Sequence, residues 1–254
     1  TFYADLTKAA QNADIALSAF RYAFTAGAPV PRELAAAVTA KLGATLVTAY
    51  GQSEGQNITI TRPTDPIEKI TSTDGRFHAC ITWKLVDPDR RIIAAGESGE
   101  IAYRGPNVCL GYLDPAHTAA AFDSEGFIYS GDLGLVDDDG YWRIVGRRKD
   151  IIIRGGENIS PAEIEDILFG HPMLENVSIV GYADPRLGQR ACAVAIPAPG
   201  MLPTLADLTK YMAGRRVAKY KYPERLILVD TLPMTASGKV RKEELRNMVL
   251  GEPI

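Results

Sequence analysis

Cysteine and histidine are scarce in this chain of 254 residues, which contains three of each. Cys80, Cys109 and Cys192 stand far apart, without the paired spacing of a zinc ribbon or the density of a disulfide-stapled domain. We expect them to be reduced and mostly buried. The histidines show no metal-ligand spacing either, which disfavours a zinc hydrolase.

Positive charge is not in excess, since 28 Lys and Arg face 31 Asp and Glu and the net charge is -3. Such a chain has no basic field with which to neutralise phosphates, so nucleic acid is excluded as a partner. Apolar runs such as residues 151–153 fall far short of the about 20 residues that cross a bilayer, so no transmembrane segment is expected. No charged-then-apolar leader opens the chain, and we expect a cytoplasmic protein.

The composition is that of an ordinary globular protein, with 46% hydrophobic and 23% charged residues. A chain of this length can form one large domain or two ordinary ones. In its first part, residues 23–28 and 45–50 are predicted to be strands, and a helix is expected to start at Pro31. Between 77 and 145, short β segments alternate with Asp/Gly turns, which predicts an antiparallel sheet or a small barrel.

A second unit is expected to begin at Lys149. Ser160 to Glu163 carry the pattern of a helix capping box, with proline at the first helical position. The other predicted elements are strands at 151–153, 177–180, 191–196 and 226–229 and helices at 204–217 and from 242. The fold class expected is therefore an α/β and β-barrel part over residues 1–148, followed by a small α+β domain over residues 149–254.

Four segments stand out, and they occur in a fixed order. They are AYGQSE at 49–54, YSGD at 129–132, GRRKD at 146–150 running into GGENISP at 155–161, and PMTASGK at 233–239. GEIAYRG at 99–105 and GY at 111–112 lie between them. In this order the segments resemble the adenylate-forming superfamily of acyl-CoA synthetases, firefly luciferases and peptide-synthetase adenylation domains. The resemblance covers essentially the whole chain.

The resemblance implies an ATP-dependent reaction in two steps. A carboxylate attacks the α-phosphate of ATP to give an acyl-adenylate and pyrophosphate, and a thiol then displaces AMP. Such chemistry depends on positioning and charge neutralisation. The expected cofactors and partners are therefore ATP, Mg²⁺, coenzyme A and a small carboxylic acid.

By the same resemblance, several residues are assigned to the nucleotide. Tyr50 offers an aromatic face to adenine, although it is alternatively a core tyrosine at a strand end. Gly27 and Ala28 would lie against the purine, where small residues permit close approach of the backbone. Gly51 is also assigned to nucleotide binding, together with Ser53, which stands where the family usually has threonine and keeps the hydroxyl.

The charged residues of the motifs receive roles in the same way. Asp132 offers two acceptor oxygens that suit two vicinal ribose hydroxyls, although an aspartate in such a turn is often simply solvated. Arg147 is implied to contact the ribose, whereas Arg148 is interpreted as a surface residue. Glu54 is a hard oxygen ligand that is implied to help hold Mg²⁺ and to act in catalysis.

Lys239 is the principal catalytic candidate, because a point charge on a long stem can reach the carboxylate and the α-phosphate. Lys149 takes the place of the hinge about which the family's small domain swings. Gly155 and Gly156 are implied to face the site in the other pose, beside the thiol channel. The plain alternatives are a solubilising lysine for Lys239 and a linker lysine for Lys149.

Residues 151–165 (IIIRGGENISPAEIE) resemble the acyl-CoA ligase branch most. The acid is then a fatty, aromatic or alicyclic carboxylic acid, which the sequence does not distinguish. Two alternatives stay open: an adenylation domain that feeds a carrier protein, and a non-catalytic module that binds adenylates.

One family feature is missing from these residues. Full members carry a Ser/Thr/Gly-rich loop, ending in lysine, that wraps the β- and γ-phosphates. We therefore expect residues 1–148 to be the incomplete C-terminal portion of a large AMP-binding domain, and residues 149–254 to be the small mobile domain. On its own the chain is expected to be inactive and to need the missing N-terminal half, in cis or from another chain.

Overall fold

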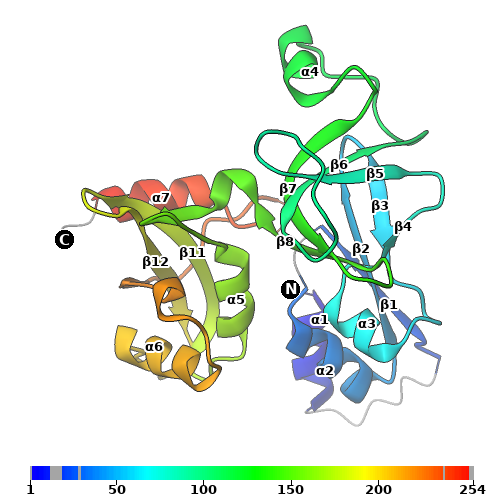
Figure 1. Ribbon diagram of the computed structural model, residues 1–254. Coiled ribbons are helices and arrows are strands. Elements are labelled where there is room, and N and C mark those ends of the chain that lie inside the picture. Colours follow the sequence, from blue (N-terminus) through cyan, green and yellow to red (C-terminus); the bar gives the residue numbers. More distant parts are fainter. Residues whose placement is uncertain (1, 12–18, 28–29, 237, 252–254) are drawn as a thin grey trace. The chain divides into compact units, whose positions relative to one another are not determined.

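The computed structural model describes residues 2–11, 19–27, 30–236 and 238–251. It divides into two compact units, Thr1–Arg148 and Lys149–Ile254, which are described separately (Figure 1). Ala28, assigned above to the purine, lies outside the described residues.

The first unit opens with a mixed sheet in which the strands follow one another in chain order. Its strands are β1 (Tyr22–Ala26), β2 (Thr45–Gln52), β3 (Gln56–Ile60) and β4 (Arg76–Phe77). Only β1 and β2 are parallel, and the helix α2 (Arg32–Leu42) connects them. Side chains of α1 (Phe2–Gln11), α2 and the strands β1 and β2 form an apolar cluster at the core of this part of the unit. The helix α3 (Ile67–Ser72) follows β3.

The second sheet of this unit is antiparallel throughout, as the Asp/Gly turns predict. Its strands are β5 (Thr82–Val86), β6 (Gly99–Arg104), β7 (Ile128–Val136) and β8 (Trp142–Arg147), in that order, and α4 (Pro115–Ala121) precedes β7. Trp142 and Tyr103 are its largest fully buried side chains. The barrel expectation is wrong, because β5 and β8 form two open edges in this described sheet. The spacing of turns in the sequence predicts hairpins between neighbouring strands. Closure of the sheet into a barrel would require the edge strands β5 and β8 to pair with each other, which the turn spacing does not predict.

The second unit is built on a five-stranded sheet of order β10-β9-β12-β11, with β13 paired to β12. Its strands are β9 (Ile152–Arg154), β10 (Glu157–Ile159), β11 (Leu174–Asp184), β12 (Gly188–Pro197) and β13 (Arg225–Leu228). Its helices are α5 (Pro161–Phe169), α6 (Leu205–Gly214) and α7 (Lys242–Gly251), with 3₁₀ turns at Arg148–Asp150 and Lys219–Lys221. This α+β arrangement matches the predicted element types.

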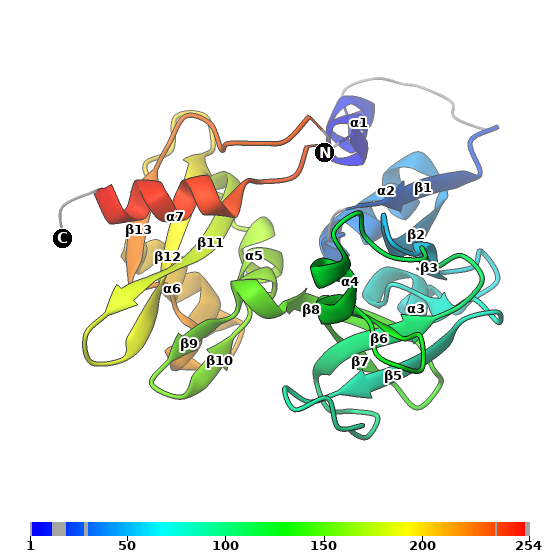
Figure 2. The same cartoon turned by 90° about the horizontal axis from the view of Figure 1, so that it is seen from above.

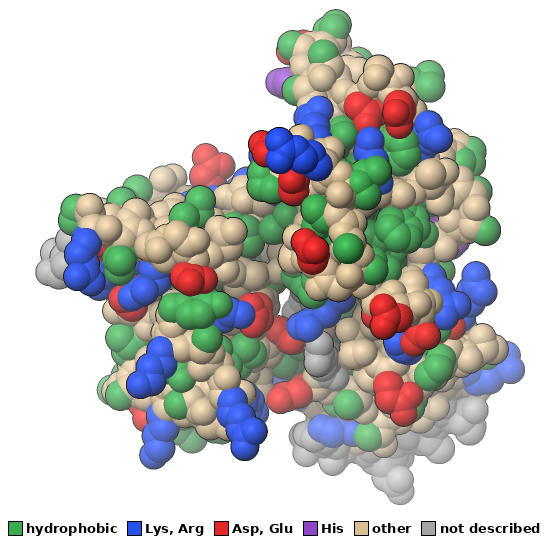
Figure 3. Space-filling model, in the orientation of Figure 1, with side chains coloured by type: hydrophobic (Ala, Val, Ile, Leu, Met, Phe, Trp, Pro, Cys, Tyr) green, Lys and Arg blue, Asp and Glu red, His purple; other side chains and the backbone are tan. Residues whose placement is uncertain are grey.

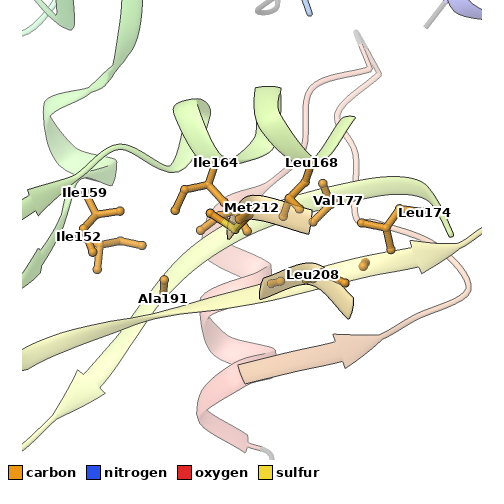
Figure 4. Close-up of a cluster of buried hydrophobic side chains, with 12 residues drawn as sticks. Ile152, Ile159, Ile164, Leu168, Leu174, Val177, Ala191, Leu208 and Met212 are labelled. Atoms are coloured by element: carbon orange, nitrogen blue, oxygen red, sulfur yellow. The ribbon is translucent and has the colours of Figure 1, made fainter. Parts of the chain in front are cut away.

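The two faces of this sheet are covered by different helices, because side chains alternate along each strand. On one face, Ile179 and its neighbours pack with Ile164 of α5 and Leu208 of α6 (Figure 4). On the other face, Val180 packs with Leu245 of α7. Figures 1 and 2 show α7 on the side of the sheet opposite to α5 and α6.

Local helix signals are confirmed in the second unit. Thr204 and Asp207 form a reciprocal capping box at the start of α6. At α5, one half of the predicted capping box is observed: the Ser160 hydroxyl accepts from the Glu163 amide at 3.4 Å, while the Glu163 carboxylate pairs with Lys221 at 2.7 Å.

The surface differs from expectation at the cysteines. Cys192 is buried, but Cys80 is exposed and Cys109 partly exposed, so the expectation of mostly buried thiols is wrong. Figure 3 shows positive and negative side chains intermixed on the face that it displays. Among the described helices, none has both the length and the apolar character to cross a bilayer.

Candidate functional site

The carboxyl ends of the parallel strands bring two of the assigned residues together. Ala26 pairs with Ala49, so Gly27 and Tyr50 follow side by side as β1 ends. Gly27 has φ +87° and open space where a side chain would be. In α/β proteins, ligands bind beside the carboxyl ends of parallel strands.

Asp132 lies at the centre of a polar cluster in this unit. Its carboxylate is only 5% exposed, and Oδ2 accepts from the Tyr50 hydroxyl at 2.7 Å and from Gln52 Nε2 at 2.6 Å. Oδ1 accepts from Arg147 Nε at 2.9 Å, since Asp132 on β7 and Arg147 on β8 are register partners. A nearly buried charge therefore has one cationic and two neutral donors, which offset the cost of its burial. It is not a solvated turn aspartate.

Tyr50 keeps its proton at neutral pH. Burial, and then the negative charge of Asp132, raise the pKa of its phenol well above the ordinary value. The phenol thus remains a donor to Asp132. Gln52 was missed by sequence reasoning, although Tyr50 and Gln52 are two residues apart on one strand and so share a face.

Gly51 has a structural reason to be glycine. A Cβ at this position would lie 1.7 Å from the carbonyl oxygen of Gln56, because the β2–β3 hairpin brings the two backbones together at a bulge. Ser53 is exposed at the tip of this hairpin. The nucleotide-binding assignments of Gly51 and Ser53 stay predictions.

Glu54, at the same hairpin tip, is held by Tyr112, to which the sequence analysis assigned no role. Its Oε1 accepts from the Tyr112 hydroxyl at 2.8 Å, and its carbonyl accepts from the Cys109 amide at 2.7 Å. Burial, followed by the hydrogen bond to Glu54, raises the pKa of Tyr112 to about 12. Sequence reasoning noted the Gly-Tyr pair but not that it would contact Glu54, 58 residues away.

Glu54 fits a divalent cation only in part. The described residues contain no group of three or more His, Cys, Asp or Glu side chains that could enclose a metal. Mg²⁺ in proteins is commonly held by one or two carboxylates and by substrate phosphates. A single oriented carboxylate is therefore compatible with Mg²⁺ that is also held by the phosphates of a bound nucleotide.

Arg148 is more than a surface residue. Its side chain is 53% exposed, yet Nη1 lies 3.0 Å from Oε2 of Glu100, which is itself nearly buried. The other oxygen of Glu100 accepts from the amide of Gly131, next to Asp132. Arg148 is thus linked through Glu100 to the backbone of Gly131, the residue before Asp132.

In the second unit, Gly155 and Gly156 form the two-residue turn between β9 and β10. Their φ angles of +59° and +90° favour glycine, and the Gly155 amide donates to the carbonyl of Leu187 at 2.8 Å. Arg154, directly before the turn, makes two hydrogen bonds to Glu224, each 3.0 Å long. The turn is therefore anchored to the sheet from both sides.

Lys239 is exposed and lies at the end of a tight turn. The Thr235 amide donates to the carbonyl of Lys239 at 2.8 Å, and the Thr235 hydroxyl accepts from the Lys239 amide at 3.1 Å. Lys149 is the first residue of the second unit and is exposed in the 3₁₀ turn Arg148–Asp150. Both side chains are placed by short local structure, and both roles stay predictions.

These features define a two-unit, mixed α/β protein with a polar, ion-paired cluster where such folds bind nucleotides. The family described as "AMP-binding enzyme" matches residues 1–113, and the "AMP-binding enzyme C-terminal domain" matches residues 163–239. The medium-chain fatty-acid–CoA ligase of Escherichia coli is 41% identical over 98% of this chain and 44% of its own length.

Solved structures agree with this match. The ATP-bound structure of MatB from Rhodopseudomonas palustris has a TM-score of 0.84 and 30% identity over 90% of this chain and 45% of that chain. O-succinylbenzoate coenzyme A synthetase (MenE) from Bacillus subtilis, in complex with ATP and magnesium, has a TM-score of 0.82 and 30% identity over 94% and 49%. The chain belongs to the AMP-binding, or adenylate-forming, superfamily. It spans less than half the length of each of the three relatives named here.

Proposed function

We propose that this chain is part of an acyl-CoA ligase, which adenylates a fatty, aromatic or alicyclic carboxylic acid with ATP and then transfers the acyl group to coenzyme A. The observation that carries the proposal is the Asp132 cluster, a nearly buried carboxylate that is paired with Arg147 and bonded to Tyr50 near the strand ends. The name of the Escherichia coli relative supports the branch.

Recognition of the nucleotide is assigned to the first unit. Tyr50, whose ring is held by its hydroxyl bond to Asp132, provides a flat face for adenine, and Gly27 leaves open space beside it. Asp132 accepts from the sugar, and Arg147, half exposed and already oriented by Asp132, lies close enough to reach the same group.

Charge neutralisation is assigned to two further residues. Glu54 would hold Mg²⁺ together with the nucleotide's own oxygens, and the ion would neutralise phosphate charge. Lys239 would stabilise the charge that develops on the attacking carboxylate and the α-phosphate, because it carries an exposed ammonium group and its backbone is bonded to Thr235.

The thioester step is assigned to another part of the second unit. The Gly155–Gly156 turn, which has no side chains and is anchored at Leu187 and Glu224, would line the path of the thiol. Lys149 would be the hinge, because it is exposed at the boundary between two compact units.

The relatives are more than twice as long as the part that aligns here, so activity is proposed for the longer protein. Apart from PMTASGK at 233–239, which is assigned to Lys239, the sequence given contains no Ser/Thr/Gly-rich loop ending in lysine that could hold the β- and γ-phosphates. We therefore propose that this chain binds nucleotide through the first unit but does not turn over alone.

ATP–pyrophosphate exchange over a panel of carboxylic acids, with and without coenzyme A, tests the proposal. It should be measured on this chain, on a version extended upstream, and on the extended Lys239→Ala variant. Exchange is expected in the extended protein alone, with a loss of about 100-fold or more in Lys239→Ala. Adenylate binding without exchange in either length would overturn the ligase assignment. Transfer of the acyl group to a carrier protein and not to coenzyme A would instead assign the chain to the adenylation domains that feed a carrier protein.

A further inference from the structure

Two polar side chains behind Asp132, Gln52 and Tyr103, have no role in the proposed function as stated. Gln52 Nε2 donates to Oδ2 of Asp132 at 2.6 Å and to the carbonyl of Ser130 at 2.9 Å. The Tyr103 hydroxyl in turn donates to Oε1 of Gln52 at 3.3 Å. These bonds form a continuous chain from β6 through β2 to β7.

The chemistry of its neighbours fixes the orientation of the Gln52 amide. On one side lie the carboxylate of Asp132 and the carbonyl of Ser130, which only accept. On the other side lies the hydroxyl of Tyr103, which can donate. Reversing the amide would place its oxygen against two acceptors, so a single orientation is favoured.

Tyr103 is itself immobilised. It is fully buried, and a Cβ at Gly55 would lie 2.5 Å from its ring, so the ring packs directly against the hairpin backbone. Burial, followed by the charges of Glu54 and Asp132, raises the pKa of Tyr103 well above the ordinary value. The hydroxyl therefore stays protonated and available to Gln52 at neutral pH.

The two oxygens of Asp132 are left unequal by this arrangement. Among the residues that the structure describes, Oδ2 accepts from Tyr50 and Gln52, whereas Oδ1 accepts from Arg147 alone. A carboxylate offers about four acceptor positions. The remaining capacity therefore lies on Oδ1, the oxygen beside the half-exposed Arg147.

We propose that Gln52, held by Tyr103, is a positioning residue that saturates Oδ2 of Asp132 and so presents Oδ1 to a sugar hydroxyl of the bound nucleotide. The inference rests on the proposed function and narrows it, because one oxygen of Asp132 then meets the sugar, and not both as the sequence analysis expected. It assigns sugar recognition to a buried three-residue chain of hydrogen bonds and not to Asp132 alone. Position 52 is then a determinant of the preference for a nucleotide with free sugar hydroxyls.

Calorimetric binding of AMP and of 2′,3′-dideoxyadenosine monophosphate to the whole chain tests this inference. The variants are Gln52→Met, which keeps the length and removes the amide, and Tyr103→Phe, which keeps the ring. Tyr129→Phe is the matched control, because it removes a phenol on β7 that bonds a different carboxylate, Asp123, at 3.1 Å. Thermal melting of every variant checks the fold.

We expect Gln52→Met to weaken AMP binding about tenfold and Tyr103→Phe about threefold, with binding of the dideoxy nucleotide unchanged. Tyr129→Phe should bind both as the unaltered chain does. Equal losses for both nucleotides, or no loss for AMP, would overturn the inference. If the unaltered chain itself binds AMP no better than the dideoxy nucleotide, the proposed sugar site fails, and the inference falls with it. If Gln52→Met does not fold, the inference is tested by Tyr103→Phe alone, which should weaken binding of AMP but not of the dideoxy nucleotide.

Discussion

Glu224 accepts two parallel hydrogen bonds from Arg154, from Nε to Oε2 and from Nη2 to Oε1, each 3.0 Å long. Arg190 Nη1 lies 3.3 Å from Oε1 of the same carboxylate. One glutamate therefore ties β9 and β12 together immediately before the Gly155–Gly156 turn.

Replacing this carboxylate should loosen the turn. Glu224→Gln is expected to lower the free energy of unfolding by about 1–3 kcal/mol, because Arg154 loses its charged partner in a mostly buried setting, while Arg190 keeps its pairing with Asp184 at 2.5 Å. Hydrogen exchange at the Gly155 amide should rise as well. Glu244→Gln is the matched control, since the Arg241–Glu244 pair is about half exposed on both sides and should contribute less than about 0.5 kcal/mol. Equal losses in the two variants would contradict the prediction.

The same pair predicts a pH dependence. The hydrogen bond from Arg154 outweighs burial and lowers the pKa of Glu224 below its ordinary value of 4.5. Its stabilising contribution is therefore complete above pH 4.5 and is lost as pH falls through the lower folded value. Denaturant unfolding of the unaltered chain and Glu224→Gln should give a difference that shrinks toward zero in acid. If the difference in free energy of unfolding between the two proteins stays constant down to pH 3, the ion pair between Arg154 and Glu224 does not lower the pKa of Glu224 as stated.

Asp74 should behave in the opposite sense. Its Oδ2 accepts from the Ile144 amide at 2.8 Å, but burial raises its pKa to about 6. Above that pH the buried, ionised carboxylate of Asp74 lowers the free energy of unfolding. This cost disappears as the pH falls toward the ordinary pKa of 3.8 that the group has in the unfolded chain. Asp74→Asn, which keeps an acceptor for Ile144, should stabilise the first unit by about 1–2 kcal/mol at pH 7.5 and have no effect near pH 4.

Asp123 in the same unit provides the contrast. Burial alone would raise the pKa of Asp123, but Lys84 at 2.7 Å and the Phe127 amide lower it below the ordinary value. Asp123→Asn should therefore destabilise the unit at neutral pH. If Asp74→Asn also destabilises it there, the assignment for Asp74 is wrong.

Gly51 gives a steric prediction. Gly51→Ala would force a Cβ against the carbonyl oxygen of Gln56, and backbone atoms cannot yield as a flexible side chain can. We expect a loss of more than about 2 kcal/mol in the first unit. Gly126→Ala, where φ is +79° and the space is open, should cost only the about 1 kcal/mol of a left-handed alanine. Urea unfolding measures both, and a reversed order would refute the steric account.

Sequence reasoning succeeds here where the signal is local and fails where it is not. The apolar run at 191–196 and the cap signal at Ser160 depend on neighbouring residues, and both the strand β12 and the Ser160 cap of α5 are observed. β11 runs from Leu174 to Asp184, beyond the predicted 177–180, because pairing with β12 extends it past its apolar centre.

The candidate site shows the same limit. Asp132 and Arg147 are joined by one hairpin, and the family motifs named both. Gln52 reaches Asp132 across 80 residues, and Tyr112 reaches Glu54 across 58. Both residues lie in segments that the family resemblance includes, but neither segment indicates which distant side chain its residue contacts. Only the packing of the two sheets in the first unit shows what these side chains contact.

Arg147 and Arg148 form a natural pair with which to test the proposed nucleotide site. Each is half exposed, and each pairs with a nearly buried carboxylate, Asp132 for Arg147 and Glu100 for Arg148. Replacement of either by alanine should therefore destabilise the first unit to a similar degree. Only Arg147→Ala alters the donor on Oδ1 of Asp132, so it alone should weaken AMP binding, by about tenfold or more. Calorimetric titration with AMP beside urea unfolding separates the two effects. Equal losses of affinity would mean that the arginines act through stability, and that Arg147 has no separate contact with the nucleotide.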